Sequence, residues 1–138
     1  MVRTVARFEG TLAKPRVGES GAGELAAILT AGLRSKGFAP SSAKDKEYAH
    51  FFKCHSSDRE YEVMVAFDFN SDRTWEVSCP PVLGRVAKLL GATEDAEHSN
   101  LVAAIASILH ADARMKDIRW YRTYGDRLDQ SSNSYNDA

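Results

Sequence analysis

Three carboxylates near the middle of the chain come closest to a catalytic arrangement. They are Glu62, Asp68 and Glu76. The residues around them alternate between apolar and polar, which places all three on one face of two neighbouring strands. Paired carboxylates act as acid and base when burial separates their pKa values. Nothing in the sequence indicates burial here, and charges on the wet face of a strand commonly keep it soluble. We therefore name no catalytic residue and do not expect an enzyme.

Four residues are of the types that bind zinc, namely His50, Cys54, His55 and Cys79. None of them has the C-x-x-C or H-x-x-x-H spacing that strengthens such an assignment. If the strands that carry them form a meander, one intervening strand separates Cys54 from Cys79 by roughly 9–10 Å. That distance is too long for a disulfide bond. We expect two reduced, buried cysteines, no metal and no cofactor.

A glycine-rich segment from Gly18 to Gly23 precedes a predicted helix. Helix N-termini attract anions, but the segment lacks the Lys-Ser/Thr pair of a phosphate-binding P-loop. The segment could still border a pocket. The alternative function is a small-molecule-binding or enzymatic α+β domain with its pocket near this loop.

A basic segment near the C-terminus is interleaved with aromatic residues. It contains Arg114, Lys116, Arg119, Arg122 and Arg127, with Trp120, Tyr121 and Tyr124 among them. This pattern is typical of a stacking platform for single-stranded nucleic acid. Trp120, however, has the inward parity of Ile118, and the acidic strands offset the positive charge. The pattern therefore does not favour nucleic acid as the partner.

Regular alternation between Glu60 and Cys79 predicts a β-hairpin. Its apolar set is Tyr61, Val63, Val65, Phe67 and Phe69 in the first strand, then Trp75 and Val77 in the second. The two apolar sets must share a face, so Phe67 lies opposite either Trp75 or Val77. The first register leaves the three-residue loop 70–72, which is a common hairpin length. We expect Trp75 and Trp120 to be core residues of one sheet.

The complete pattern predicts the order β-α-β-β-β-α-α-β. Beside the hairpin, strands are expected at 2–8, 47–54 and 117–124, and helices from about Ser20 to Gly37, from Val82 to Leu90 and from Thr93 to His110. The strand 47–54 has two possible inner faces, one with Tyr48, His50 and Phe52 and the other with Ala49 and Phe51. The fold class is α+β, a mostly antiparallel sheet of about five strands with helices packed on one face. Residues 1–127 form a single domain, and 128–138 form a polar, flexible tail.

Composition sets the broad class. The chain has 138 residues, of which 43% are hydrophobic and 27% charged, as in one globular domain. A net charge of −1 gives no global attraction to nucleic acid or to an anionic membrane. No apolar run reaches membrane length and no signal-peptide core is present, so we expect a cytoplasmic protein. The charge is uneven, because residues 47–78 carry three basic and seven acidic side chains, a balance of −4.

The last third of the chain has a distinctive arrangement. An apolar helix with Ile105, Ile108 and Leu109 is followed by a short polar link and then by Ile118-Arg119-Trp120-Tyr121. This arrangement resembles the end of small bacterial α+β immunity proteins, which belong to polymorphic-toxin and contact-inhibition systems. The resemblance implies a cytoplasmic protein that masks the active site of a cognate toxin by tight one-to-one binding.

Charge gives this expectation a physical basis. A sheet face lined by carboxylates can mimic the phosphate backbone and steer a basic partner toward it. The expected partner is therefore a toxin with a basic cleft, bound by a monomer or a small homo-oligomer. The predicted binding residues are Glu60, Glu62, Asp68 and Glu76, joined by Arg119 and Tyr121 if the last strand shares the open face.

Overall fold

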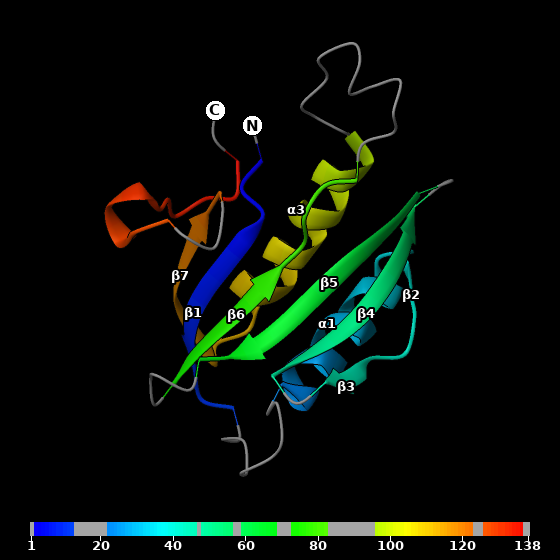
Figure 1. Cartoon of the computed structure of the whole chain (residues 1–138), viewed down its shortest axis with the longest axis horizontal. Helices are drawn as coiled ribbons and strands as arrows, with labels where there is room; N and C mark the ends of the chain where they lie inside the picture. The colour runs from blue at the N-terminus through cyan, green and yellow to red at the C-terminus, as the bar shows by residue number, and fades with distance from the viewer. Residues whose placement is uncertain are drawn as a thin grey trace.

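A computed structural model describes residues 2–12, 22–46, 48–56, 59–68, 73–82, 96–122 and 126–136. The helices are α1 (Gly23–Ser35) and α3 (Ala96–Ala111), and a 3-10 turn spans Leu128–Gln130. The strands are β1 (Val5–Gly10), β2 (Ala39–Pro40), β3 (Lys44–Lys46), β4 (Ala49–Ser56), β5 (Arg59–Phe67), β6 (Thr74–Ser78) and β7 (Met115–Tyr121) (Figure 1). The predicted helix at 82–90 apart from Val82, the Thr93 cap, the hairpin loop 70–72 and most of the glycine-rich segment lie outside the described residues.

Within these ranges, seven strands form one antiparallel sheet in the order β2-β4-β5-β6-β1-β7, with β3 also paired to β4. The α+β class and the mostly antiparallel sheet are confirmed. The sheet has more strands than the five expected, because the short strands β2 and β3 pair with the outer edge of β4. Strands of two and three residues leave no readable alternation in a sequence, so these two were not predicted.

The central hairpin has the first of the two expected registers. Phe67 lies opposite Trp75 and Val65 opposite Val77. The rings of Phe67 and Trp75 pack edge to face with centroids 4.8 Å apart. Beside them, β4 directs Phe52 and Cys54 into the core. The even-numbered residues therefore form its inner face, although Tyr48, just before the strand, is 64% exposed.

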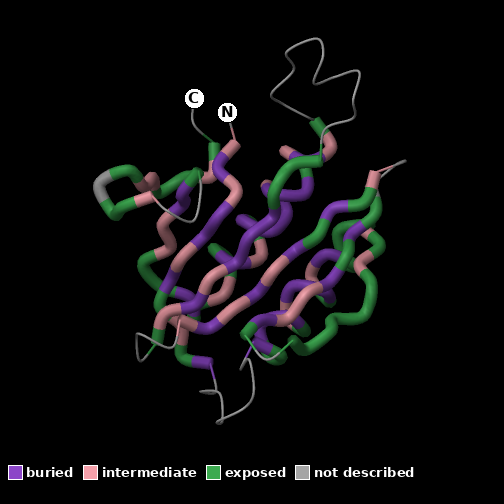
Figure 2. Tube along the Cα trace, viewed as in Figure 1, coloured by how far each residue is buried: buried purple, intermediate pink, exposed green. Residues whose placement is uncertain are grey.

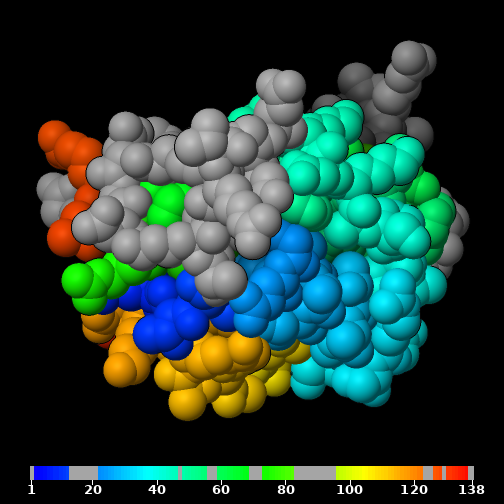
Figure 3. Space-filling model, turned by 90° about the horizontal axis from the view of Figure 1, so that it is seen from below, coloured from blue at the N-terminus to red at the C-terminus, as the bar shows by residue number. Residues whose placement is uncertain are grey.

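Both described helices cover the same face of the sheet (Figure 1). The buried stripe of α1 includes Leu25, Leu29 and Leu33. That of α3 includes Leu101, Ile105 and Leu109. Gly37 has a φ of 90° and follows the end of α1, as predicted for a left-handed cap. Seen from below, the start of α1 (mid-blue) lies against the turn between α3 and β7 (orange), where Arg114 reaches Glu24 at 3.2 Å (Figure 3).

A β-bulge interrupts the pairing of β7 with β1. The register shifts between Arg7 and Glu9, and Asp117 on the opposing strand has a φ of 54°. The extra residue reverses the parity of the strand, so that Met115 and Trp120 both reach the core although their numbers differ by five. The strand therefore begins two residues earlier than the alternation around Ile118 and Trp120 indicates.

The C-terminal segment runs back along β7. Ser132 exchanges two backbone hydrogen bonds with Trp120, of 2.7 and 2.9 Å. The backbone N–H of Arg3 donates to the carbonyl oxygen of Tyr135 at 2.7 Å, and the Tyr135 ring packs edge to face on Trp120. We expected a flexible tail here from its polar composition; in the structure, Ser132 and Asn136 form isolated bridges with Trp120 and Val2.

Trp75 and Trp120 test the face assignment. Their residues are 0% and 2% exposed, respectively, and both lie on the helix-covered side of the sheet. Replacing either by Ala should lower the free energy of unfolding by about 3–5 kcal/mol, because it removes a large buried aromatic. Tyr48→Ala, at an exposed position, is the control and should change it by less than about 0.5 kcal/mol. Denaturant unfolding measures all three, and near-wild-type stability of Trp75→Ala would show that the sheet faces are assigned the wrong way round.

Candidate functional site

The sheet has one face that no described helix covers, and Figure 1 looks onto it. The strand registers define one row on this face, which runs across five strands. In order across the sheet, the row contains Tyr121, Val5, Ser78, Met64 and Phe51. We call this set the apolar row. Figure 2 shows the same strands alternating between buried and more exposed positions, as a sheet with a single covered face must.

A second row, on one side of the apolar row, is held together by Arg7. Its Nε donates to Glu76 Oε2 at 3.0 Å, and its guanidinium lies 4.6 Å from the centre of the Tyr121 ring. Arg119 is the cross-strand neighbour of Arg7 and donates instead to Ser131 Oγ at 2.9 Å and to Asn133 Oδ1. Tyr121 and Arg119 are therefore held by neighbouring groups of the same chain.

Burial dominates the electrostatics of Glu76. It raises the pKa of this carboxyl above its ordinary value, against the hydrogen bond and the charge of Arg7, which lower it. The negative charge of Asp68 adds to the rise, which places Asp68 near Glu76. The Glu76 carboxylate is thus a mostly buried partner of Arg7, and the least available of the four predicted acids.

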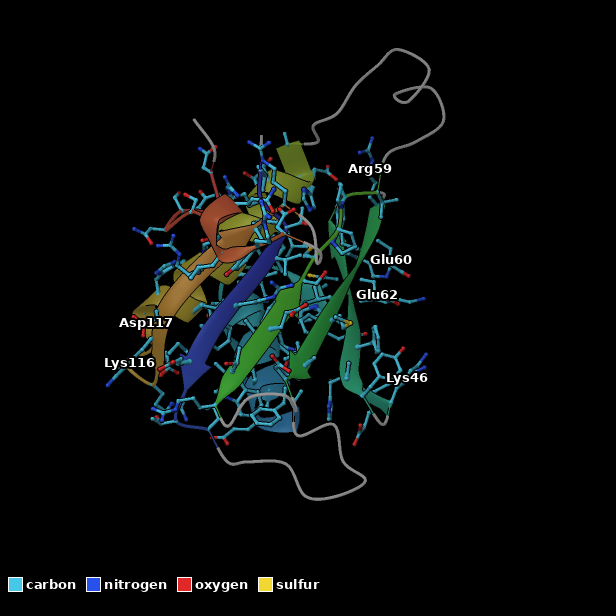
Figure 4. All side chains as sticks on the ribbon, turned by 60° about the vertical axis from the view of Figure 1, so that its left-hand side comes forward. Lys46, Arg59, Glu60, Glu62, Lys116 and Asp117 are labelled. Carbon is cyan, nitrogen blue, oxygen red and sulfur yellow. The ribbon has the colours of Figure 1, made fainter. Side chains whose placement is uncertain are left out.

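The acids on β5 lie at the other side of the apolar row. Glu60 makes ion pairs with Lys53 at 3.1 Å and with His55 at 2.9 Å. Glu62 lies directly opposite Lys53 in the register, yet the lysine reaches Glu60. Among the residues that the structure describes, Glu62 is therefore an exposed acid with no ion-pair partner. Figure 4 shows Glu60 and Glu62 projecting from β5 on the side away from the helices.

The structure thus brings all six predicted residues to the open face, but in different environments. Glu60 and Glu62 are exposed, Asp68, Glu76 and Arg119 are partly buried, and Tyr121 is buried. Arg119 and Tyr121 were expected among the binding residues only if the last strand belonged to the same sheet face. That strand, β7, lies beside β1 in the sheet.

A cavity on this face, near the ends of β6 and β7, was not predicted. It has a volume of about 350 Å³ and lies over the apolar row. Its lining is mostly apolar and includes Val5, Phe51, Met64, Ser78, Pro80 and Pro81, with Glu62 and Arg122 also at its wall. Met64 was the one sequence signal of an apolar patch on this face, since it is a large apolar residue at a position where the alternation predicts a solvent-facing side chain. Phe51 could be added only once the inner face of β4 was known.

The two edges of the sheet are covered to different extents. β2 and β3 pair with β4 on one side, and Ser132 pairs with β7 on the other. The lysines Lys44 and Lys46 on β3 further discourage strand addition. The β4 edge is therefore covered, whereas β7 is bridged at Trp120 alone among the described residues.

The residues of zinc-binding type include two buried cysteines that lie near enough for Cys54 to raise the pKa of Cys79. Cys54 and Cys79 are free and buried, and burial raises the pKa of Cys79 to about 12. His98 Nε2 lies 2.6 Å from the carbonyl oxygen of Cys79. Within the described ranges, no three His, Cys, Asp or Glu residues gather in a way that could hold a metal ion.

None of the described helices has the length and hydropathy needed to cross a bilayer.

The Arg7–Glu76 pair gives a test of the second row. Arg7→Met should raise the pKa of Glu76 further, because it removes the hydrogen bond and the charge that lower it. Because the pKa of Glu76 is higher in the folded chain than in the unfolded chain, protonated Glu76 favours folding. This contribution is complete at pH values below the unfolded pKa and is lost as the pH rises through the folded pKa. The variant should therefore lose more stability across that window.

Carboxyl 13C NMR titration measures this pKa directly. Arg119→Met is the matched control, since Arg119 is on the same face but bonds to Ser131 and Asn133. An unchanged or lower Glu76 pKa in Arg7→Met would contradict the pairing.

Comparison with known proteins adds no identification. No family model matches the chain, and neither a curated protein nor a solved structure matches it. The function therefore has to be inferred from the open face itself.

Proposed function

We propose that this chain is a protein-binding module and that its open sheet face binds the partner. The observation that carries this is the apolar row with the cavity over it, on a face that no described helix covers. Charged side chains flank it, with Arg7 and Glu76 on one side and Glu60 and Glu62 on the other. An apolar centre with a polar rim is the usual anatomy of a protein–protein interface.

The identity of the partner is the finer part of the proposal. The resemblance of the C-terminal third to immunity proteins favours a cognate bacterial toxin whose active site this face masks. The described arrangement changes the expected balance of forces. Glu60 and Glu76 are already paired with basic side chains, so they offer less charge than the sequence implies. We propose that Phe51 and Met64, the partly exposed members of the apolar row, supply most of the affinity and that the acids mainly affect the rate of association.

The alternative function stays a prediction. Its pocket was expected near Gly18–Gly23, and most of that segment lies outside the described residues. No observation on the described residues favours it over partner binding.

Two sets of variants test the open face against a partner captured from the native host. Met64→Gln keeps the length of the side chain and removes its apolar end. It should weaken binding by about 1–2 kcal/mol, mainly through faster dissociation. Glu60→Lys with Glu62→Lys should slow association, and the loss should shrink as salt rises because ions screen the steering. Glu76 is left unchanged, since reversal there would place two cations together in a mostly buried site.

Surface plasmon resonance at two salt concentrations gives both rates. Lys36→Glu, at the end of α1 on the other side of the sheet, is the control and should bind like the wild type. Unchanged affinity of Met64→Gln, with weakened binding of Lys36→Glu, would place the interface on the helices and overturn the proposal.

A further inference from the structure

The basic, aromatic segment near the C-terminus is divided by the fold. Its rings Trp120 and Tyr121 are only 2% and 5% exposed, so neither offers a free face on which a base can stack. Its charge stays outside the core, because β7 carries Lys116 and Arg119 against the single acid Asp117. The positive charge of this segment therefore lies along a strand at the end of the sheet.

The outer edge of β7 has backbone groups directed away from β1. Trp120 shows the direction, since its N–H and C=O exchange hydrogen bonds with Ser132. Backbone groups alternate along a strand, so those of Ile118 point to the same side. The register also gives Ile118 no partner on β1. Among the described residues, Ser132 makes the one bridge to this edge, and an extended segment can add here as a further strand.

The segment that now makes this bridge is residues 130–136, and it has little apolar surface to hold it in place (Figure 1). Tyr135 is its only large apolar residue and packs edge to face on Trp120. A cavity of about 360 Å³ lies between residues 133–135 and α3. Local opening of a segment with so few apolar contacts costs less free energy than unfolding of the whole chain.

Arg119 indicates which chemistry the edge favours. Its Nε donates to Ser131 Oγ at 2.9 Å, and its Nη1 donates to Asn133 Oδ1. Both acceptors are neutral, and no acid of the described residues pairs with this guanidinium. A carboxylate accepts a hydrogen bond from a guanidinium roughly twice as strongly as a neutral group does. An added strand with an acidic side chain at either position would therefore bind Arg119 more strongly than residues 130–136 do.

We propose that the outer edge of β7 is a second binding surface, which takes an extended acidic segment of a protein as an added strand. The main chain of that segment bonds to Ile118 and Trp120, and its carboxylate pairs with Arg119. Residues 130–136 are then a cover that competes for the same edge. This inference goes beyond the proposed function, because it uses a different surface and does not depend on the partner of the open face.

A synthetic peptide is the probe, so no identified partner is needed. It copies residues 130–136 with Ser131→Glu and Asn133→Glu, and a matched neutral peptide has Gln at both positions. Titrated into the 15N-labelled chain, the acidic peptide should shift the amides of Ile118 and Trp120 in a saturable way. It should bind about fivefold more tightly than the neutral peptide, as expected for charge-assisted hydrogen bonds near the surface.

Three variants of the chain separate this account from non-specific attraction. Tyr135→Ala should tighten the binding of both peptides, because it weakens the competing cover. Arg119→Gln should remove the preference for the acidic peptide. Arg34→Gln is the control, since Arg34 is in the last turn of α1, and it should keep the preference.

Several results would overturn the proposal. One is the absence of saturable shifts at Ile118 and Trp120 in both the wild-type and the Tyr135→Ala chains. Another is equal affinity for the two peptides, or a preference that survives Arg119→Gln. Tighter binding of a single-stranded oligothymidylate at the same amides would overturn it too, and would assign this edge to nucleic acid.

Discussion

The pairing of β5 with β6 is the constraint on which the rest of the structure depends. It sets Phe67 opposite Trp75, and this aromatic pair faces the helices. A slip of one residue would turn Trp75 to solvent and carry Glu76 into the core. The large cost of both changes fixes the register, and the register in turn fixes the open face. Ser78 comes to lie beside Met64, and Glu76 comes within reach of Arg7.

The same face shows how burial separates acids of similar sequence context. Glu62 and Glu76 both alternate with apolar residues on one hairpin. Glu76 lies on a central strand beside β1, so neighbouring chain buries it and Arg7 pairs with it. Glu62 lies opposite Lys53, but that lysine has a second acid within reach. One carboxylate is therefore held within the sheet by Arg7, and the other remains available to a partner.

Sequence reasoning succeeded where a pattern is local. The alternation around Val65 and Val77 was enough to predict the hairpin, to limit its register to two choices and to place the acids on a shared face. It failed where the outcome depends on distant residues. The partner of Glu76 is 69 residues away in the chain, so its ion pair follows only from the strand order β6-β1. The inner face of β4 was undecided because aromatic residues occupy both parities, at Phe51 and Phe52.

Two further features have no readable signal in the sequence. The bulge at Asp117 depends on how β7 meets β1, and a single acidic residue within a strand does not announce it. Residues 128–136 are polar, yet their backbone groups pair with Trp120 and Arg3. Backbone hydrogen bonds carry little sequence specificity, so composition alone could not show this docking.

The most direct test of the open face is hydroxyl-radical footprinting of the chain with and without its captured partner. Met64 is the reporter, because it is partly exposed in the apolar row, and the buried Met115 is the internal control. We predict that the partner slows oxidation of Met64 severalfold while Met115 and the exposed Leu128 keep their rates. Unchanged oxidation of Met64, with protection of Ile28 and Ile108 on the helices, would contradict binding at the open face.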